Sequence, residues 1–358
     1  RRDGTQEGGG PDVGQADQRC GGRSRGIEKS GRMKKGWVAL IGIAALVIVI
    51  FVWFILPVRE ANISRLFPNT TAGIIVVNID TENPVVGNLL EQAEDIIQNS
   101  GFSSFKKKLF TALFPGIVPR KIVALYIPNL ESVRPQYVVF ISLGRLSKVL
   151  HIVSSPIDNM LFKGQEIVKK RVRLRKITYI EKAEGDIMPT AKMVFGNNLV
   201  ISNNPEIISS MVQNKNREEN PWWRGTFPVV ENVTTADINI ILSNTDGGFS
   251  SVVKKIETDF AFAAFPSIDA VETMEGNIVL EEDKLEGLME FKCNDPAQIN
   301  AVRSDVRFLY GAMRRVVKSF DINMKGEVSE GEESVGLDFY MENYINALLQ
   351  TMNTFGGE

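Results

Sequence analysis

Apolar and polar positions divide the chain into a polar start, one long apolar run and an extended region of mixed pattern. The apolar run, Trp37–Leu56, has twenty consecutive residues without a charge. As a helix it would be roughly 30 Å long, which matches the hydrocarbon core of a bilayer. Trp37 and Trp53 stand near its ends, where aromatic rings favour the membrane interface. The pattern predicts a transmembrane signal anchor over residues 33–58, in preference to a buried core helix or a cleaved signal peptide.

Positive charges are concentrated before the apolar run, and few follow it. Met33 followed by Lys34 and Lys35 is a typical opening of a bacterial signal sequence. Residues 1–32 are polar, rich in glycine and without periodicity, so we expect either a disordered tail or upstream sequence that is not translated. The positive-inside rule puts the N-terminus inside the bacterial cytoplasmic membrane and everything after Pro57 outside it, in a periplasmic or other extracytoplasmic space. No cleavage signal follows the run, so we expect the anchor to be retained as a single pass.

After the anchor, segments with the two-residue period of strands alternate with segments that have the 3.6-residue period of helices. A similar series of such segments occurs in each half of this region. Ala72–Ile79 is apolar and β-branched, as is typical of a central strand, and Leu285–Cys293 alternates apolar and polar residues. Asn or Asp followed by Pro opens a helix at positions 83, 204 and 295. The sequence predicts an α+β fold: one N-terminal transmembrane helix, then two tandem domains of mostly antiparallel sheet with helices packed on one face. The predicted first domain covers residues 59–215 and the second covers residues 235–354, with a linker over 216–234.

Composition narrows the class of protein. The chain of 358 residues is 44% apolar and 23% charged with a net charge of −2, which fits a globular protein and argues against a nucleic-acid partner. Its two cysteines, Cys20 and Cys293, would lie on opposite sides of the membrane and could not form an intramolecular disulfide. An ectodomain of this size without disulfides favours a bacterial envelope protein.

A family resemblance follows from several short motifs. These are a proline-containing segment before an apolar strand (LFPNTTAGIIVVNID, 66–80), a strand that enters a helix (VISNNPEIISSMV, 200–212) and an aromatic linker (NPWWRG, 220–225). Together with the anchor, this layout resembles a loose group of uncharacterised bacterial single-pass membrane-anchored proteins of unknown function with tandem extracytoplasmic α+β domains. The resemblance implies an architecture and no catalytic residues.

Two groups of residues are candidates for binding. The run KKRVRLRK (169–176), taken as one strand, would place Arg171, Arg173 and Arg175 on one face, as a patch for anionic lipid headgroups or an acidic wall polymer. The alternative is a solvated strand face or a charged edge strand. Trp222 and Trp223 in the linker would either contact a partner or pack in the seam between domains.

The sequence shows no catalytic, cofactor or metal constellation. His151 is the only histidine, so a zinc site or a catalytic triad lacks partners. The acidic turn 327–333 lacks the spacing of a calcium loop, and Cys293 is expected to be a buried thiol. We therefore expect a membrane-anchored extracytoplasmic protein with a binding, scaffolding or envelope-maintenance role, its partner being another envelope protein, a lipid or a cell-wall polymer. Two alternatives stay open: a carrier of an apolar ligand such as a lipid, with FAFAAF (260–265) lining the cavity, and an envelope hydrolase.

Overall fold

The computed structural model describes the part of the chain that follows the apolar run, with gaps. The described residues are 62–88, 90–91, 104, 108, 118–128, 136–143, 158, 162, 165–180, 189–213, 222–223, 227, 236–244, 247–248, 250, 265–282 and 284–345. Pro57–Glu358 form one compact unit. The predicted transmembrane segment 33–58 lies outside the described residues. Within those residues, no helix combines the length and the apolar character needed to cross a membrane.

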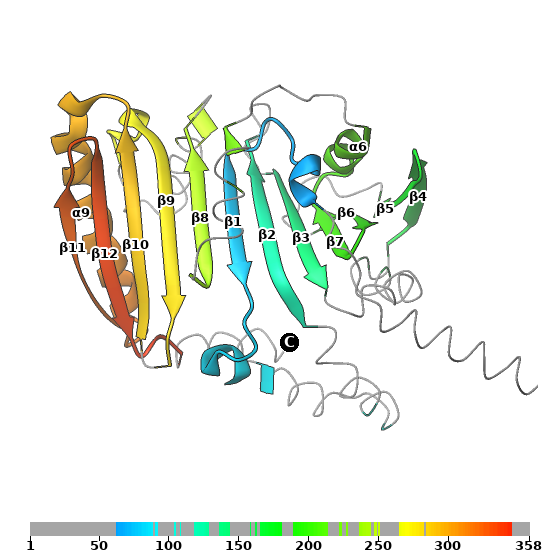
Figure 1. Ribbon diagram of the computed structural model, residues 1–358, viewed down its shortest axis with the longest axis horizontal. Coiled ribbons are helices and arrows are strands. Elements are labelled where there is room, and N and C mark those ends of the chain that lie inside the picture. The colour runs from blue at the N-terminus through cyan, green and yellow to red at the C-terminus, as the bar shows by residue number, and fades with distance from the viewer. Residues whose placement is uncertain are drawn as a thin grey trace, which may run out of the picture. The chain divides into compact units, whose positions relative to one another are not determined.

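Within the described residues, twelve strands form a single sheet in which every pair of neighbours is antiparallel (Figure 1). The mostly antiparallel α+β class predicted from the sequence is confirmed. The first half of the chain contributes these strands: β1 (Gly73–Asn78), β2 (Pro119–Ile127), β3 (Gln136–Leu143), β4 (Ile167–Val172), β5 (Arg175–Ile180), β6 (Ala191–Phe195) and β7 (Asn198–Ser202). The second half contributes β8 (Ile238–Ser243), β9 (Val271–Leu280), β10 (Lys284–Cys293), β11 (Asn323–Glu330) and β12 (Ser334–Glu342).

The halves meet where β1 pairs with β8, and each half continues outward with the same plan. One half runs β1-β2-β3-β7-β6-β5-β4, and the other runs β8-β9-β10-β12-β11. Five strands on each side therefore correspond in order. Among the described residues, the β4–β5 hairpin has no counterpart in the second half, and β4 is one of the two edge strands of the sheet.

Few described helices accompany the sheet: three 3-10 turns, η1 (Ile63–Leu66), η3 (Ile268–Ala270) and η4 (Pro296–Gln298), and two α-helices, α6 (Pro205–Gln213) and α9 (Ile299–Lys318). A shorter helical turn covers residues 84–88. The predicted Asx-Pro helix starts are confirmed, because the side-chain oxygens of Asn83, Asn204 and Asp295 each accept a backbone N–H two residues on, at 2.9, 2.8 and 3.0 Å.

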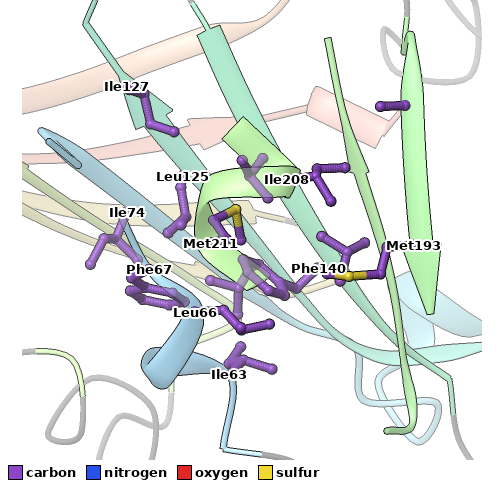
Figure 2. Packing of buried hydrophobic residues seen from close by; sticks show 14 of the residues in the cluster. Ile63, Leu66, Phe67, Ile74, Leu125, Ile127, Phe140, Met193, Ile208 and Met211 are labelled. Carbon is purple, nitrogen blue, oxygen red and sulfur yellow. The ribbon is translucent and has the colours of Figure 1, made fainter. Parts of the chain in front are cut away.

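The first hydrophobic core lies between the sheet, η1 and α6 (Figure 2). Phe67 is at its centre, with ring centroids 5.6 Å from Phe140, 5.3 Å from Trp223 and 4.8 Å from Phe227. Ile208 and Met211 on the inner side of α6 reach the same cluster. Tilted and edge-on aromatic contacts of this kind add specificity to apolar burial.

The second core lies against the opposite face of the sheet. Ile74 of β1 belongs to the first core and is paired with Ile241 of β8, whereas Ile240 and Leu242 pack on the second core. Directly paired residues point to the same face and successive residues to opposite faces, so the two cores occupy different faces. The helix α9 covers the second core with Val302 and Val306.

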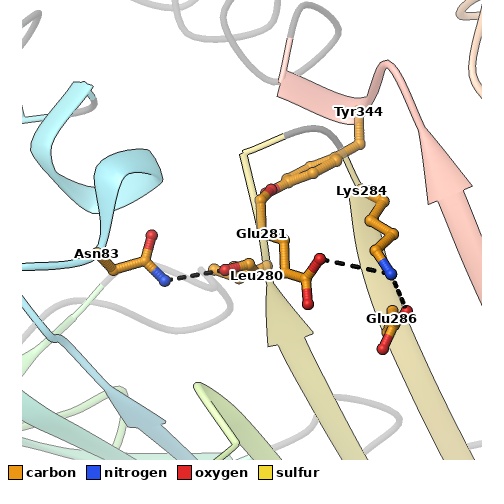
Figure 3. A network of polar contacts seen from close by, with 6 residues as sticks. All are labelled: Asn83, Leu280, Glu281, Lys284, Glu286 and Tyr344. Carbon is orange, nitrogen blue, oxygen red and sulfur yellow. Dashed lines mark hydrogen bonds and ion pairs between the residues drawn. The ribbon is translucent and has the colours of Figure 1, made fainter.

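A polar network joins the two halves at one end of the central strands (Figure 3). The Asn83 side chain donates to the Leu280 carbonyl at 2.9 Å, and the Tyr344 hydroxyl donates to the Glu281 carbonyl at 2.8 Å. The Leu280 N–H in turn donates to Asp237 Oδ2 at 2.7 Å. These bonds fix the end of β9 to the segment that follows β1 and to the segment that follows β12.

Candidate functional site

The basic run 169–176 does not form one strand. It forms the end of β4, a two-residue turn at Arg173 and Leu174, and the start of β5, with Val172 paired to Arg175. Arg173 adopts a left-handed backbone conformation, with φ of 51°. The chain reverses between Arg171 and Arg175, so the expected alignment of three arginines along one strand face is wrong.

The hairpin instead brings four cations to one face of the sheet. Across β4 and β5, Lys169 is paired with Thr178 and Arg171 with Lys176. Thr178 is paired in turn with Lys192 of β6. Since paired residues share a face, Lys169, Arg171, Lys176 and Lys192 point to the same side. We call these four residues the basic face.

Lys192 is buried within this face and forms an ion pair. Its Nζ lies 2.5 Å from Asp158 Oδ1, and the two side chains are only 4% and 3% exposed. Lys169 Nζ lies 3.9 Å from the other oxygen of the same carboxylate. Burial lowers the pKa of Lys192, the hydrogen bond to Asp158 opposes that shift, and the charges of Lys176 and Lys169 lower the pKa further. One carboxylate therefore balances several neighbouring cations.

A pocket of about 220 Å³ opens beside the buried pair. Its described lining consists of Leu174, Arg175, Lys176, Thr178, Lys192, Met193 and Val194. Three of these residues are cationic, and cations grouped in a concave site raise the local concentration of anions. The volume is below the usual range for a drug-sized ligand, so it suits a small acidic group.

The other two arginines of the run do not belong to the basic face, although Arg175 also lines the pocket. Arg175 is on the opposite face, where its guanidinium lies 4.9 Å above the Phe195 ring. Arg173 is exposed at the tip of the hairpin beside Leu174, whose side chain is 93% exposed. The tip thus combines a solvent-exposed leucine with cations on either side.

The linker tryptophans are both packed into the first half of the chain. Trp223 is 5% exposed and contacts Phe67, and Trp222 packs against the same cluster while its Nε1 donates to the Thr71 carbonyl at 2.7 Å. In this arrangement Trp223 has almost no surface to offer a partner. The use of Trp222 and Trp223 as partner contacts stays a prediction.

The sequence also singled out His151, Cys293 and the run FAFAAF (260–265). His151 lies outside the described residues. Cys293 is buried, and burial raises its pKa. Of FAFAAF, only Phe265 is described; it is packed edge-on to Phe291, with ring centroids 6.0 Å apart. Within the described residues, no three or more His, Cys, Asp or Glu side chains are grouped so that they could hold a metal ion.

Sequence patterns could find only part of this site. The cationic run signalled Lys169, Arg171 and Lys176, but it contains no Gly, Pro or Asn to mark the turn at Arg173. Lys192 stands in an apolar strand, and Asp158 lies far from it in sequence, so nothing local indicates their pairing.

The chain is thus an α+β protein built on one antiparallel sheet with a basic face at one edge. Solved structures of TP0453 are similar to it. Crystal form III is 11% identical with a TM-score of 0.42, and the match covers 79% of this chain and 95% of that chain. Crystal form I is 13% identical with a TM-score of 0.42 and covers 81% and 96%, respectively. No family model matches the sequence, and no curated protein matches it.

Proposed function

We propose that this protein is a membrane-anchored, extracytoplasmic and non-enzymatic binding protein of the bacterial envelope that captures an acidic ligand at the basic face. The anchor is the apolar run Trp37–Leu56, with its excess of cations on the preceding side. A single-pass anchor would hold the folded unit close to the membrane.

One observation carries the ligand assignment: four cations from three adjacent strands share one face beside a pocket. Lys169, Arg171 and Lys176 are exposed, and Lys192 is buried against Asp158. Lys192 of the buried pair lines the pocket, while the exposed cations remain able to meet an anion. Each cation near an anionic surface contributes about 1 kcal/mol to binding.

The position of the site in the fold supports the same proposal. The β4–β5 hairpin extends the shared five-strand plan in the first half alone, within the described residues. It carries Lys169, Arg171 and Lys176, and the sheet does not need it to join the two halves. Because the hairpin is not needed to hold the two halves together, its residues can be used to bind a ligand.

Calorimetric titration of the detergent-solubilised full chain tests the proposal. We expect binding of short-chain phosphatidylglycerol or of a soluble acidic polymer, and none of short-chain phosphatidylcholine. The triple variant Lys169→Glu, Arg171→Glu and Lys176→Glu should bind roughly a hundredfold more weakly, since three favourable contacts of about 1 kcal/mol each are lost.

A matched control has the same change of charge at another exposed surface. Arg307→Glu, Arg314→Glu and Arg315→Glu alter three exposed residues of α9 in the second half. This control should bind as the unmodified chain does. If both triple variants lose binding equally, or if the unmodified chain binds no acidic ligand, the proposal fails.

A further inference from the structure

The tip of the β4–β5 hairpin presents an unusual apolar side chain. Leu174 is 93% exposed, and the next most exposed large apolar side chain among the described residues is Phe320 at 55%. Leu174 is at the apex of a two-residue turn that joins the edge strand of the sheet to its neighbour. It therefore projects from the end of the sheet.

Cations surround this leucine on both sides. Arg173 and Arg175 are its chain neighbours, and Arg171 and Lys176 form the second cross-strand pair from the turn. Arg173 adopts its left-handed conformation at a position where glycine would meet less steric resistance. Backbone strain of this kind in an exposed turn is a reason to look for a function there.

We propose that the hairpin tip docks on an anionic phospholipid bilayer, with Leu174 inserted at the boundary of the acyl chains and the flanking cations at the headgroups. This inference rests on the proposed function and names its partner. An apolar apex gains free energy only from an apolar phase, which a bilayer offers and a soluble acidic polymer does not. Basic and apolar groups together are the combination that gives stable association with anionic membranes.

The cations and Leu174 contribute to membrane association by different amounts and under different conditions. Each cation near an anionic leaflet strengthens association about fivefold, and burial of a leucine side chain strengthens it by at least about tenfold. The cations act only on anionic lipid, whereas the leucine would act on any bilayer once it is in contact. Insertion should therefore depend on anionic lipid, and removal of the cations should abolish it.

A fluorescent label at the tip tests insertion in the full chain. The variant Leu174→Cys is made together with Cys20→Ser and labelled with the environment-sensitive dye NBD. Cys293 is buried with a raised pKa, so it should not react. The labelled chain is reconstituted into vesicles of phosphatidylcholine alone and into mixed phosphatidylcholine–phosphatidylglycerol vesicles. We expect blue-shifted emission and protection from acrylamide quenching only in the mixed vesicles.

Leu288→Cys provides a matched control, because Leu288 is also an exposed leucine, at 50%, but lies on β10 in the second half. A label there should keep its aqueous emission in both vesicles. Arg171→Glu, Arg173→Glu and Lys176→Glu together should remove the shift at position 174. An equal shift at both labelled positions, or a shift that survives these three substitutions, would overturn the inference.

The outcomes separate this inference from the proposed function. An aqueous label at position 174 in mixed vesicles, combined with calorimetric binding of an acidic ligand that requires the basic face, overturns membrane insertion alone. An aqueous label combined with no binding of any acidic ligand overturns both.

Discussion

At Lys192, one carboxylate offsets the cost of burying a charge. The Lys192 and Asp158 side chains are almost fully buried and lie 2.5 Å apart, and Lys169 lies 3.9 Å from the same carboxylate. A buried ion pair stabilises a fold little relative to apolar residues, but loss of one partner leaves an uncompensated charge. The pair therefore holds the Lys192 side chain in place beside the pocket more than it stabilises the protein.

This balance predicts an unequal response to substitution. Lys192→Met should lower the free energy of unfolding by about 3 kcal/mol, because Asp158 would stay buried with only the distant Lys169 as partner. Adding Asp158→Asn should restore much of that loss, since the isolated charge is then removed. Chemical denaturation of the full chain in detergent measures both changes. A double variant no more stable than the single one would contradict this account of the pair.

At the scale of single residues, the helix starts at the three Asx-Pro pairs were predictable from the sequence. The three Asx-Pro pairs formed helix starts because their side-chain oxygens accept a nearby N–H in any tertiary setting. The environment of Lys192 was not predictable. It depends on Asp158, 34 positions earlier, and on the β5–β6 pairing that brings Thr178 beside it.

At the scale of secondary-structure elements, a hydrogen bond links the end of β9 to the segment that follows β12. Tyr344 is 7% exposed and donates its hydroxyl hydrogen to the Glu281 carbonyl (Figure 3). Burial, together with the negative charges of Asp237 and Glu281, raises the pKa of Tyr344 from 10.0 to about 12. The folded protein thus holds this proton at a pH where the unfolded chain releases it.

The raised pKa predicts a loss of stability in alkaline solution. The contribution of Tyr344 is fully present below pH 10 and is lost as the pH rises toward about 12, with a total of roughly 2 to 3 kcal/mol. Tyr344→Phe should be about 1 kcal/mol less stable at neutral pH because the hydrogen bond is gone, and it should lose less stability above pH 10. Denaturation at a series of pH values compares the two proteins, and parallel curves would show that Tyr344 titrates normally.

Strands were easier to predict than the turn that creates the basic face. The alternation in Leu285–Cys293 predicted which residues of β10 share a face, and Phe291 and Cys293 are buried on that face. The β6–β7 turn has a local cause, because Gly196 there adopts a φ of 60°, which glycine tolerates without a steric penalty. In KKRVRLRK the sequence has no residue that favours a turn, and the reversal at Arg173 depends on pairing along β4 and β5.

For the whole molecule, the two halves form one sheet through the pairing of β1 with β8. The sequence predicted two similar halves, and the strand order outward from β1 and β8 corresponds over five strands. It did not predict the shared sheet, because a β-branched run such as Gly73–Asn78 specifies a buried strand without specifying its partner. The division into two domains with a linker over 216–234 stays a prediction.

For the whole molecule, we predict that ligand binding is confined to one edge of the sheet. Only one edge of the sheet carries the β4–β5 hairpin and the basic face. The other edge carries β11 and the cationic helix α9, which provides an internal comparison. An acidic ligand that is attracted only by overall charge would affect both edges.

Hydrogen–deuterium exchange of the full chain in detergent, with and without short-chain phosphatidylglycerol, tests the central claim most directly. We predict slower exchange on ligand addition in Ile167–Val172, Arg175–Ile180 and Ala191–Phe195, with no change in Ile299–Lys318. Protection of Ile299–Lys318 without protection of the β4–β5 hairpin would contradict the assignment of the basic face as the binding site.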